Sequence, residues 1–338
     1  MPVTLNPFAA DAFNLYSLTQ GIQSLPNLYS DLMDEGIFMP EPIATQDFWV
    51  EQENGVLNLI PSAPYGAPGS EAKHAKRDAI AFQLIHLIHN DTILPAAIQG
   101  VRAFNSAELN TYAAEMTKRL AAMKKKFDIT HEHLLAGAIK GQILDADSTV
   151  LVNLFTKFGI SEESVDFILG TTTTDVSAKC RYVIRHIEEN LKGERMTGVD
   201  CKCSPEFFDA LISHPLVKEK FLNWSASAEL RGDPRKSFPF GGITFREYSA
   251  KATNAAGSTV RFVGAKKARF YPVGTTDTFK LVQGPADYEE TVNTPGQLYY
   301  AKQWEVEPGS GRGWKLQGQS HLLPMCCRPA VLVEGYTA

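Results

Sequence analysis

The chain has 338 residues, a net charge of −5 and an apolar fraction of 44%. Its length exceeds that at which one hydrophobic core usually stops growing, so we expect one elaborate domain or two subdomains. The composition is that of an ordinary globular protein and excludes a disordered or fibrous chain. The mild acidity argues against a dedicated nucleic-acid binder, which would carry a basic face.

Five cysteines leave one thiol unpaired under any disulfide scheme. The Cys-x-Cys at Cys201 and Cys203 and the adjacent Cys326-Cys327 are poor frameworks for structural bridges or for zinc. Residues 1–14 lack the charged and apolar regions of a signal peptide, and no apolar run approaches the roughly 18 residues of a membrane span. We therefore expect a soluble protein with reduced thiols, made in a cytoplasm without export.

Residues 1–45 contain short apolar patches that prolines interrupt, which predicts an extended arm. Short helical turns are expected near Asn14–Gln20 and Leu28–Asp34. Such an arm cannot bury its own apolar side chains, so it must lie on the body of the protein or on a neighbour.

Residues 47–94 predict a long hairpin, with one arm from Phe48 to Pro61 and the other over Ala79–Ile93. Pro61–Lys76, rich in Gly, Pro, Ala and Ser, would form a flexible tip. A two-stranded excursion is marginally stable in water by itself, and no later segment is an obvious cover for its apolar face. This hairpin is the sequence feature that most favours oligomerisation.

A long helix is predicted from Ser106, a good N-cap, through Phe127, because apolar residues recur there at helical spacing. A second helical stretch over His131–Ile139 either continues this helix or resumes it before Gly141. Ile143-Leu144, a turn, and Val150–Leu154 then read as strand, turn and strand.

From Gly170 onward helices and strands alternate. Three helices are expected here. The first runs from Asp175 to Leu191, the second starts at Ser204-Pro205-Glu206, and the third covers Leu216–Ala228. The expected strands are Thr197–Cys203, Phe240–Tyr248 and Ala268–Tyr271. A terminal hairpin joins Tyr299–Glu307 to Trp314–Leu322 through Pro308–Gly313, with Trp304, Val306, Trp314 and Leu316 on a dry face.

The histidines show no metal-ligand spacing. His131 and His133 point about 200° apart on a helix, whereas a metalloprotease motif needs two histidines at i and i+4. We interpret them as polar residues of a helix surface. His86 and His89, three apart on a strand, should face opposite sides.

The remaining motifs favour structure over catalysis. Gly309–Gly313 precedes a strand, so it predicts a hairpin turn rather than a phosphate loop. Gly170–Asp175 precedes a helix but lacks the Gly-Lys-Ser/Thr of a P-loop. The acid pairs Glu162-Glu163, Glu188-Glu189 and Glu289-Glu290 show no cleft, and Cys326-Cys327 would form a strained bridge. We therefore expect no catalytic, cofactor-binding or metal-binding residues, and no enzyme.

A basic cluster surrounds the long helix, and it predicts a solvated face. Alternatives are ion pairs between subunits or loose, salt-sensitive contact with packaged nucleic acid. The cluster consists of Lys118, Arg119, Lys124, Lys125 and Lys126.

Short motifs follow one another in a specific order over nearly the whole chain. They are Gly55-Val56-Leu57, Asp91-Thr92-Ile93, Ile98–Phe104, Ala136–Gly141, Ile143–Asn153, Ser204–Phe208, His214–Lys218, Pro272-Val273-Gly274, Pro285-Ala286-Asp287 and Arg328-Pro329. This order resembles that of the lambda-type phage major capsid proteins, the capsid protein E family.

The resemblance implies an α+β chain with the Hong Kong 97-type capsid fold. Residues 1–45 would be its N-terminal arm and 46–95 its extended loop. The peripheral domain would combine 96–169, including a spine helix at 106–141, with 296–338, and the axial domain would be 170–295. Because the body-like pattern begins near Phe8, any scaffold would be a separate protein or already removed.

The resemblance further implies a shell subunit that forms pentamers and hexamers around a phage genome. Its partners would be other copies of itself, a portal, a scaffold, a decoration protein and non-specifically held double-stranded DNA, without a membrane or a cofactor. It would occupy the virion, and the host cytoplasm during assembly. The competing interpretations are an encapsulin-like compartment shell and a soluble enzyme of unknown type.

Overall fold

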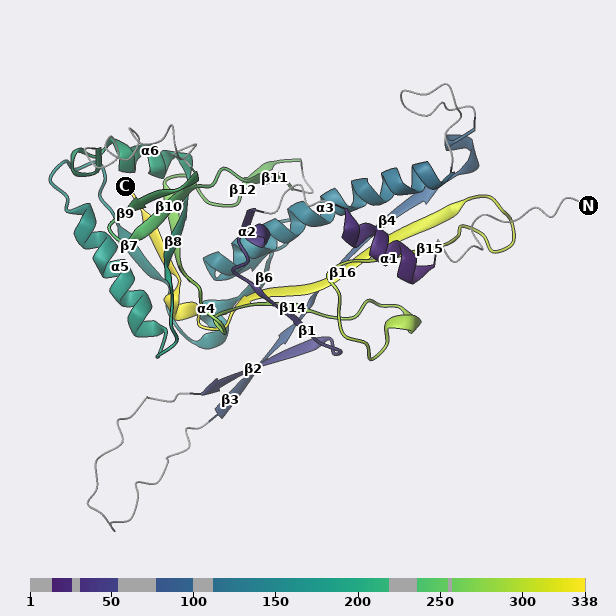
Figure 1. Cartoon of the computed structure of the whole chain (residues 1–338), viewed down its shortest axis with the longest axis horizontal. Helices are drawn as coiled ribbons and strands as arrows, with labels where there is room; N and C mark the ends of the chain where they lie inside the picture. Colours follow the sequence, from purple (N-terminus) through teal and green to yellow (C-terminus); the bar gives the residue numbers. More distant parts are fainter. Residues whose placement is uncertain are drawn as a thin grey trace, which may run out of the picture.

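The computed structural model describes residues 14–25, 31–53, 77–99, 112–218, 236–254 and 257–337. The molecule is elongated, with a longer body that contains α3 and β16 and a second body that contains α5 and α6 (Figure 1). A two-stranded hairpin projects from the longer body. No helix among the described residues is long and apolar enough to cross a membrane. The mixture of helices and mainly antiparallel strands is the expected α+β class.

The helices are α1 (Leu15–Ser24), α2 (Asp31–Asp34), α3 (Tyr112–Lys140), α4 (Leu154–Phe158), α5 (Val176–Asn190) and α6 (Pro205–Ser213). The strands up to the middle of the chain are β1 (Met39–Pro42), β2 (Asp47–Glu53), β3 (Arg77–Gln83), β4 (Ile85–Ile93), β5 (Gln142–Leu144), β6 (Val150–Asn153), β7 (Glu163–Asp166) and β8 (Gly198–Cys203). The later strands are β9 (Phe238–Phe240), β10 (Ile243–Glu247), β11 (Lys251–Thr253), β12 (Thr259–Arg261), β13 (Lys267–Val273), β14 (Phe279–Gln283), β15 (Tyr300–Glu305), β16 (Trp314–Cys326) and β17 (Val333–Tyr336).

The first sheet lies in the longer body and has the strand order β1-β14-β16-β15, with β4 also paired to β16. Helix α3 covers one face, where Ile93 and Leu316 of the sheet pack in one cluster with Met123 and Phe127. An added Cβ at Gly318 of β16 would lie 2.7 Å from the Phe127 ring. The missing side chain therefore lets the helix approach the strand closely.

The opposite face of the first sheet is polar, and segment 284–297 covers part of it. The Tyr288 hydroxyl donates to Gln317 Oε1 at 3.1 Å, and the Asp287 amide donates to Gln319 Oε1 at 2.9 Å. These contacts satisfy polar groups that the sheet would otherwise leave to solvent.

Strand β1 forms an edge of this sheet and pairs in parallel with β14. The Ile43 amide donates to the Gln283 carbonyl at 2.8 Å, so every second residue of this segment faces β14. Pro40 and Pro42 occupy the alternate positions, whose nitrogens face the open edge. Proline has no N–H to offer there, and this protects the edge from pairing with another strand.

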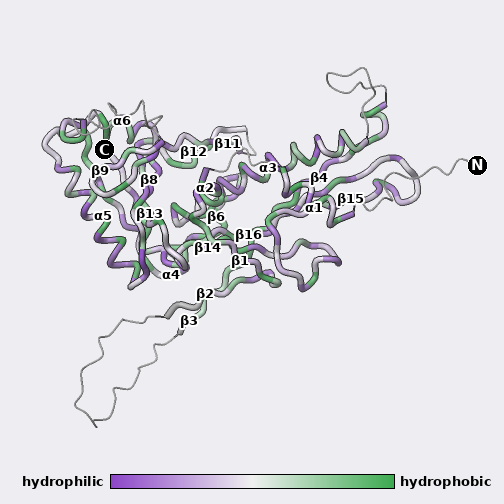
Figure 2. The backbone as a smooth tube through the Cα atoms, viewed as in Figure 1, coloured by the Kyte–Doolittle hydropathy of each residue, from purple (hydrophilic) through white to green (hydrophobic). Residues whose placement is uncertain are grey.

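Helix α3 is continuous from Tyr112 to Lys140, so the two stretches expected from the sequence form one helix. Gly141 ends it in the left-handed conformation, with φ of 75°. The predicted N-cap Ser106 lies outside the described residues. Figure 2 shows polar and apolar residues alternating along α3 and α5, as expected for helices with one buried side.

The predicted hairpin is correct near its root. Strand β2 pairs with β3 in antiparallel register, with Phe48 opposite Phe82 and Val50 opposite Ile80. The predicted second arm was too long, because Ile85–Ile93 leaves the hairpin and pairs with β16 as β4. A later segment therefore does cover part of this arm, against our expectation. The predicted tip, Pro61–Lys76, lies outside the described residues.

The second sheet has the strand order β7-β17-β13-β8-β10-β9. One of its faces is apolar, carries Cys201 and Phe270, and packs against α5 and α6. The other face is polar, because Asp200, Lys202 and Arg246 occupy the alternate positions of β8 and β10. This polar face lies toward α2 and α3, where Lys202 and Tyr248 contact Glu35 and Glu132, while one apolar cluster joins residues of both bodies elsewhere.

Local signals in the sequence placed the helices of this body correctly. Asp175 caps α5 by accepting a hydrogen bond from the Ala178 amide at 3.0 Å. Ser204 caps α6, which begins with proline. Of the expected helix Leu216–Ala228, the described residues end at Lys218, and these first three positions are helical.

Two strand predictions need correction. Phe240–Tyr248 is not one strand, because Gly241 and Gly242 turn the chain with φ of 61° and 86° and join β9 to β10. Trp304 does not share a face with Leu316. It pairs with Lys315 and is 37% exposed, because the register places Gln303 opposite Leu316.

Each sheet draws strands from more than one of the segments that the sequence analysis distinguished. Strand β14, within the expected axial range 170–295, pairs with β16 in the first sheet. Strands β7 and β17, within the expected peripheral ranges, pair with each other, and β17 pairs with β13 in the second sheet. Contacts between distant segments decide which strands share a sheet, and local sequence patterns do not indicate those contacts.

The described parts of the N-terminal arm lie on the body of the same chain. Leu18 and Ile22 of α1 are buried in the cluster beneath β15, and the Ala301 amide donates to Thr19 Oγ1 at 3.2 Å. Asn14 caps α1 as the predicted helical turn requires. Helix α2 lies at the junction of the two bodies, against α3.

Candidate assembly surfaces

His131 is buried, contrary to the interpretation that it lies on the surface of its helix. It is 1% exposed, and its Nε2 lies 2.9 Å from the Ser320 hydroxyl oxygen. Ser320 donates its own proton to the Leu298 carbonyl, so His131 Nε2 carries the proton shared between them. Burial, assisted by the charge of Lys124, lowers the pKa of His131 to about 3.

His133, His86 and His89 also contact side chains of the same chain. His133 lies with its ring centroid 5.1 Å from that of Phe262. His86 and His89 face opposite sides of β4 as expected: His86 Nδ1 lies 2.5 Å from His321 Nε2, and His89 contacts Lys126. Among the described residues, no group of three or more His, Cys, Asp or Glu side chains could hold a metal ion.

The thiols are free and mostly enclosed. Cys180, Cys201, Cys203 and Cys326 are buried, and burial raises the pKa of Cys327 to about 12. Since the thiolate is the reactive form, this thiol is a poor nucleophile. The five cysteines therefore act as small core residues, without the strained vicinal bridge considered above.

The basic cluster on α3 is not one solvated face. Lys124 is 2% exposed and forms an ion pair with Asp128 at 3.1 Å, beside the ring of Tyr299. Arg119 pairs with Glu115 and Asp91. Only Lys118, Lys125 and Lys126 of the cluster remain exposed.

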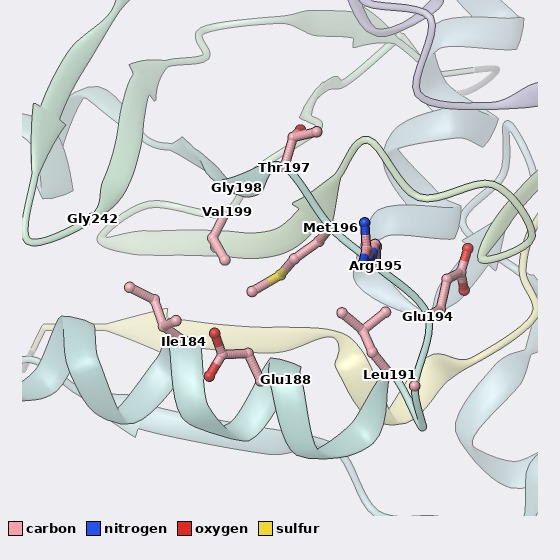
Figure 3. A pocket seen from close by; sticks show the side chains of 11 residues that line it. Ile184, Glu188, Leu191, Glu194, Arg195, Met196, Thr197, Gly198, Val199 and Gly242 are labelled. Atoms are coloured by element: carbon pink, nitrogen blue, oxygen red, sulfur yellow. The ribbon is translucent and has the colours of Figure 1, made fainter. Parts of the chain in front are cut away.

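An open cavity of about 460 Å³ lies between α5 and the segment that leads into β8. Figure 3 shows Met196 and Val199 pointing toward Ile184 of α5. The Glu194 carboxylate is used elsewhere, since it accepts hydrogen bonds from the Thr276 and Asp277 amides at 2.6 and 2.7 Å. The lining has no nucleophile–base pair, so nothing in it supports the rival enzyme interpretation.

The projecting hairpin presents an exposed aromatic side chain. Trp49 is 61% exposed, whereas its neighbours Phe48 and Val50 are each 9% exposed on the opposite face. Ala81, directly across from Trp49, is too small to cover it. A large exposed aromatic residue on a projecting strand is typical of a protein–protein contact.

The second body carries a further exposed apolar site at the loop after β7. Ile168 is 41% exposed and has φ of 47°, an unusual conformation for a β-branched residue. The Asp166 carboxylate accepts a hydrogen bond from the Ile168 amide at 2.9 Å, and the Thr174 hydroxyl donates to the Ile168 carbonyl at 3.1 Å. The protein thus holds an apolar side chain toward solvent in a strained conformation, as functional surfaces often do.

The sequence analysis pointed to the hairpin but not to Trp49 or Ile168. The alternation of Phe48, Trp49 and Val50 was the signal that could have indicated an outward aromatic side chain. No local signal indicated the conformation of Ile168.

Comparison with known proteins relates the chain to one class of protein. The family model described as phage major capsid protein E matches residues 14–337. The major capsid protein of Salmonella phage Felix O1 is 27% identical over 95% of each chain. That of Pseudomonas phage KPP10 is 28% identical over 98% of this chain and 99% of its own. Among solved structures, the capsid of Ralstonia phage GP4 covers 93% of each chain with a TM-score of 0.54 and 9% identity.

Proposed function

The chain belongs to the phage major capsid protein E family and is a structural shell protein, and from this premise we propose how its copies assemble. The fold is the Hong Kong 97-type capsid fold, and proteins of this family are structural rather than enzymatic. The subunits form pentamers and hexamers that close into an icosahedral head. Closed shells of identical chains require heterologous contacts with rotational closure, which two different surfaces of one chain supply.

The elements have distinct roles in this proposal. The second body, with its sheet from β7 to β17, is the axial domain around the symmetry axes. The longer body, with α3 as spine helix, is the peripheral domain. The β2–β3 hairpin is the extended loop, which lies over a neighbouring subunit. Support comes from its projection away from the body and from the 61% exposure of Trp49.

The exposed lysines of α3 would face the packaged double-stranded DNA. Lys118, which is 78% exposed, and Lys125 supply charge without a base-reading geometry. The contact would be independent of sequence and weakened by salt. A portal, a scaffold and a decoration protein complete the proposed set of partners, and assembly takes place in the host cytoplasm.

Electron microscopy of the purified chain, with light scattering alongside, tests the assembly proposal. Closed shells, or rings of five and six subunits, are the expected result. A homogeneous monomer or dimer that stays unassembled at high concentration, even with a scaffold supplied, would overturn it. Deleting residues 61–76 should leave folded subunits that assemble poorly, and normal shells from that deletion would contradict the extended-loop role.

A matched pair of variants tests the role of Trp49. Trp49→Ala should leave the unfolding midpoint of the subunit unchanged, because the side chain makes few contacts within its own chain, while reducing the yield of shells. Tyr16→Ala removes an aromatic side chain that is also exposed, at 73%, but lies on α1 away from the hairpin. Equal shell yields from both variants would show that Trp49 is not a specific contact.

A further inference from the structure

Helix α2 lies between α3 and the polar face of the second sheet, and it neutralises a buried cation there. Lys202 of β8 is 3% exposed. Its Nζ lies 2.6 Å from Asp31 Oδ2 and 2.7 Å from Glu35 Oε1, at the two ends of the α2 segment. A buried ammonium requires such partners, so this strand residue depends on a segment from the start of the chain.

The same segment contacts three more elements. Arg246 of β10 lies 2.7 Å from Glu35, and the Tyr271 hydroxyl of β13 donates to Glu35 at 3.4 Å. The Leu32 amide donates to Glu132 Oε1 of α3 at 3.1 Å. Residues Asp31–Glu35, which we name the α2 latch, therefore connect the second sheet to the spine helix.

Glu132 is the group on which these contacts converge from the α3 side. It is 3% exposed and accepts a hydrogen bond from the Tyr248 hydroxyl at 2.6 Å. Burial, aided by the charge of Asp31, raises its pKa to about 7, against the opposing effects of Tyr248, Leu32 and Lys202. The charged and titratable groups of the surrounding elements are Asp31 and Glu35 of α2, Asp200 and Lys202 of β8, Arg246 of β10, Tyr248 after β10, and Tyr271 of β13.

The charges at this junction do not balance when every group is ionised. Four carboxylates, including Glu132, then face the two cations Lys202 and Arg246. Besides these charges, Leu32 of α2 is buried in the apolar cluster, and Met33 packs against that cluster. A proton on Glu132 removes the excess negative charge, whereas its loss adds an uncompensated charge next to the latch.

We propose that the α2 latch is a proton-controlled conformational device that holds the second body against α3 and opens when Glu132 ionises. Opening would remove the polar contacts between α2, the second sheet and α3 at this junction, while the shared apolar cluster keeps the two bodies together. The inference concerns the single subunit, so it does not depend on the assembly proposal.

The direction of the pH dependence follows from linkage. In the closed state Glu132 holds its proton up to about pH 7, whereas a solvated carboxyl in the open state would lose it near its ordinary pKa of 4.5. Protonation therefore favours the closed state, and this preference is lost as the pH rises through 7. Between pH 5.5 and 8.5 the opening equilibrium constant should rise roughly thirtyfold.

Hydrogen–deuterium exchange of the dispersed full-length subunit tests the latch. The Leu32 amide donates to Glu132, the Glu35 amide to the Asp31 carbonyl, and the Gly36 amide to the Met33 carbonyl. Each amide hydrogen exchanges with solvent only when its hydrogen bond opens. After correction for intrinsic exchange rates, their protection should fall roughly thirtyfold from pH 5.5 to 8.5, while β16 amides stay protected.

Glu132→Gln is the decisive variant, because the neutral amide keeps an acceptor oxygen and cannot ionise. It should hold the latch closed across the whole pH range. Glu290→Gln, a change of the same kind at a carboxylate paired with Lys302 on the first sheet, should leave the wild-type pH dependence in place. The same pH dependence in Glu132→Gln as in the wild type would overturn the proposal.

A second variant keeps the test decisive if Glu132→Gln does not fold. Tyr248→Phe removes a hydrogen bond that favours ionised Glu132, so the opening midpoint should move to higher pH. A midpoint that stays in place, or latch amides that exchange only with global unfolding, would contradict the latch. Either result would leave the shell assignment intact, since both are measured on subunits that have not assembled.

Discussion

His131 and Glu132 are neighbours on α3, yet they face different bodies of the molecule. His131 contacts Ser320 in the first sheet, and Glu132 contacts Tyr248 beside the second. Burial lowers the pKa of His131 to about 3 and raises that of Glu132 to about 7. The same physical cause acts at both residues, because low polarity disfavours the charged form of either group. The two contacts of one helix therefore respond to pH in opposite directions.

The surroundings of the two residues also differ. On the His131 side, Lys124 and Asp128 form an enclosed ion pair, and the Tyr299 hydroxyl donates to Asp128 at 2.7 Å. On the Glu132 side, the ion pairs reach the surface through Asp31, whose side chain is 60% exposed. An enclosed pair within one body suits a permanent contact, whereas partly hydrated pairs between bodies suit one that can change.

The largest effect is expected from breaking the enclosed ion pair on the first side. Lys124→Met leaves Asp128 buried without its cation and should lower the free energy of unfolding by about 3–5 kcal/mol. Urea unfolding measures the loss. The double variant Lys124→Met with Asp128→Leu should recover most of the stability, because it buries no unpaired charge. A loss below about 1 kcal/mol in the single variant would show that Asp128 is hydrated in the folded protein.

A second prediction concerns how the free energy of unfolding depends on pH through His131. The stability that neutral His131 contributes is present above pH 6.5 and is lost as the pH falls toward about 3. Between pH 6.5 and 5 this loss should amount to about 2 kcal/mol. His131→Gln keeps a donor for Ser320 but cannot titrate, so it should remove this loss in chemical unfolding experiments. An unchanged pH profile would contradict the enclosed, neutral state of His131.

The opposite response is expected on the Glu132 side. Its contribution is fully present below pH 4.5 and is lost as the pH rises through about 7, so acidification from pH 7 to 5 stabilises the protein by about 2 kcal/mol. In the wild type the two effects nearly cancel over this range. Glu132→Gln should therefore lose stability on acidification, and His131→Gln should gain it. Parallel pH profiles for the two variants would refute the comparison.

A smaller effect is expected from a steric change at the contact of α3 with the first sheet. Gly318→Ala would place a Cβ against Met123 and Phe127, and it should cost about 1–2 kcal/mol as the helix shifts. Gly21→Ala on α1 is the control, since a Cβ there meets no atom within 4 Å. Thermal unfolding should show no loss of stability for the control, and a small gain from the better helix propensity of alanine.

The smallest effect is expected at the outer side of the second body. Arg181 pairs with Asp175 on α5, but their side chains are 53% and 61% exposed. Arg181→Ala should change the free energy of unfolding by less than about 0.5 kcal/mol, because solvent screens an exposed pair. A loss above 1 kcal/mol in urea unfolding would indicate that this side of α5 is less solvated than its exposure suggests.

Local sequence signals predicted many elements correctly. The cap at Asp175, the Ser204-Pro205 start of α6 and the turn before β6 each depend on residues a few positions apart. The capsid family followed from the order of such motifs, and the family match confirms it. The roles of individual histidines were not visible in these local signals.

Apart from the strand expected over 240–248, which a local Gly241-Gly242 turn divides, the predictions that were wrong depended on segments far apart in the chain. Residues 85–93 looked like part of a hairpin arm because their alternation does not specify a partner, and β16 supplies that partner. Trp304 was placed on the dry face because its register with Lys315 is set across the sheet. Polar residues such as His131 and Lys124 looked exposed because nothing near them in sequence reports what covers them.

The sequence by itself determined where helices and turns begin and end, and which family the protein resembles. Capping, proline and glycine effects act within a few residues, so the chain carries them locally. Only the tertiary structure decided that α2 meets Lys202, and that His131 and Glu132 are buried on opposite sides of one helix. Burial and charge pairing depend on which distant segments come together, because desolvation is a property of the folded surroundings rather than of the residue.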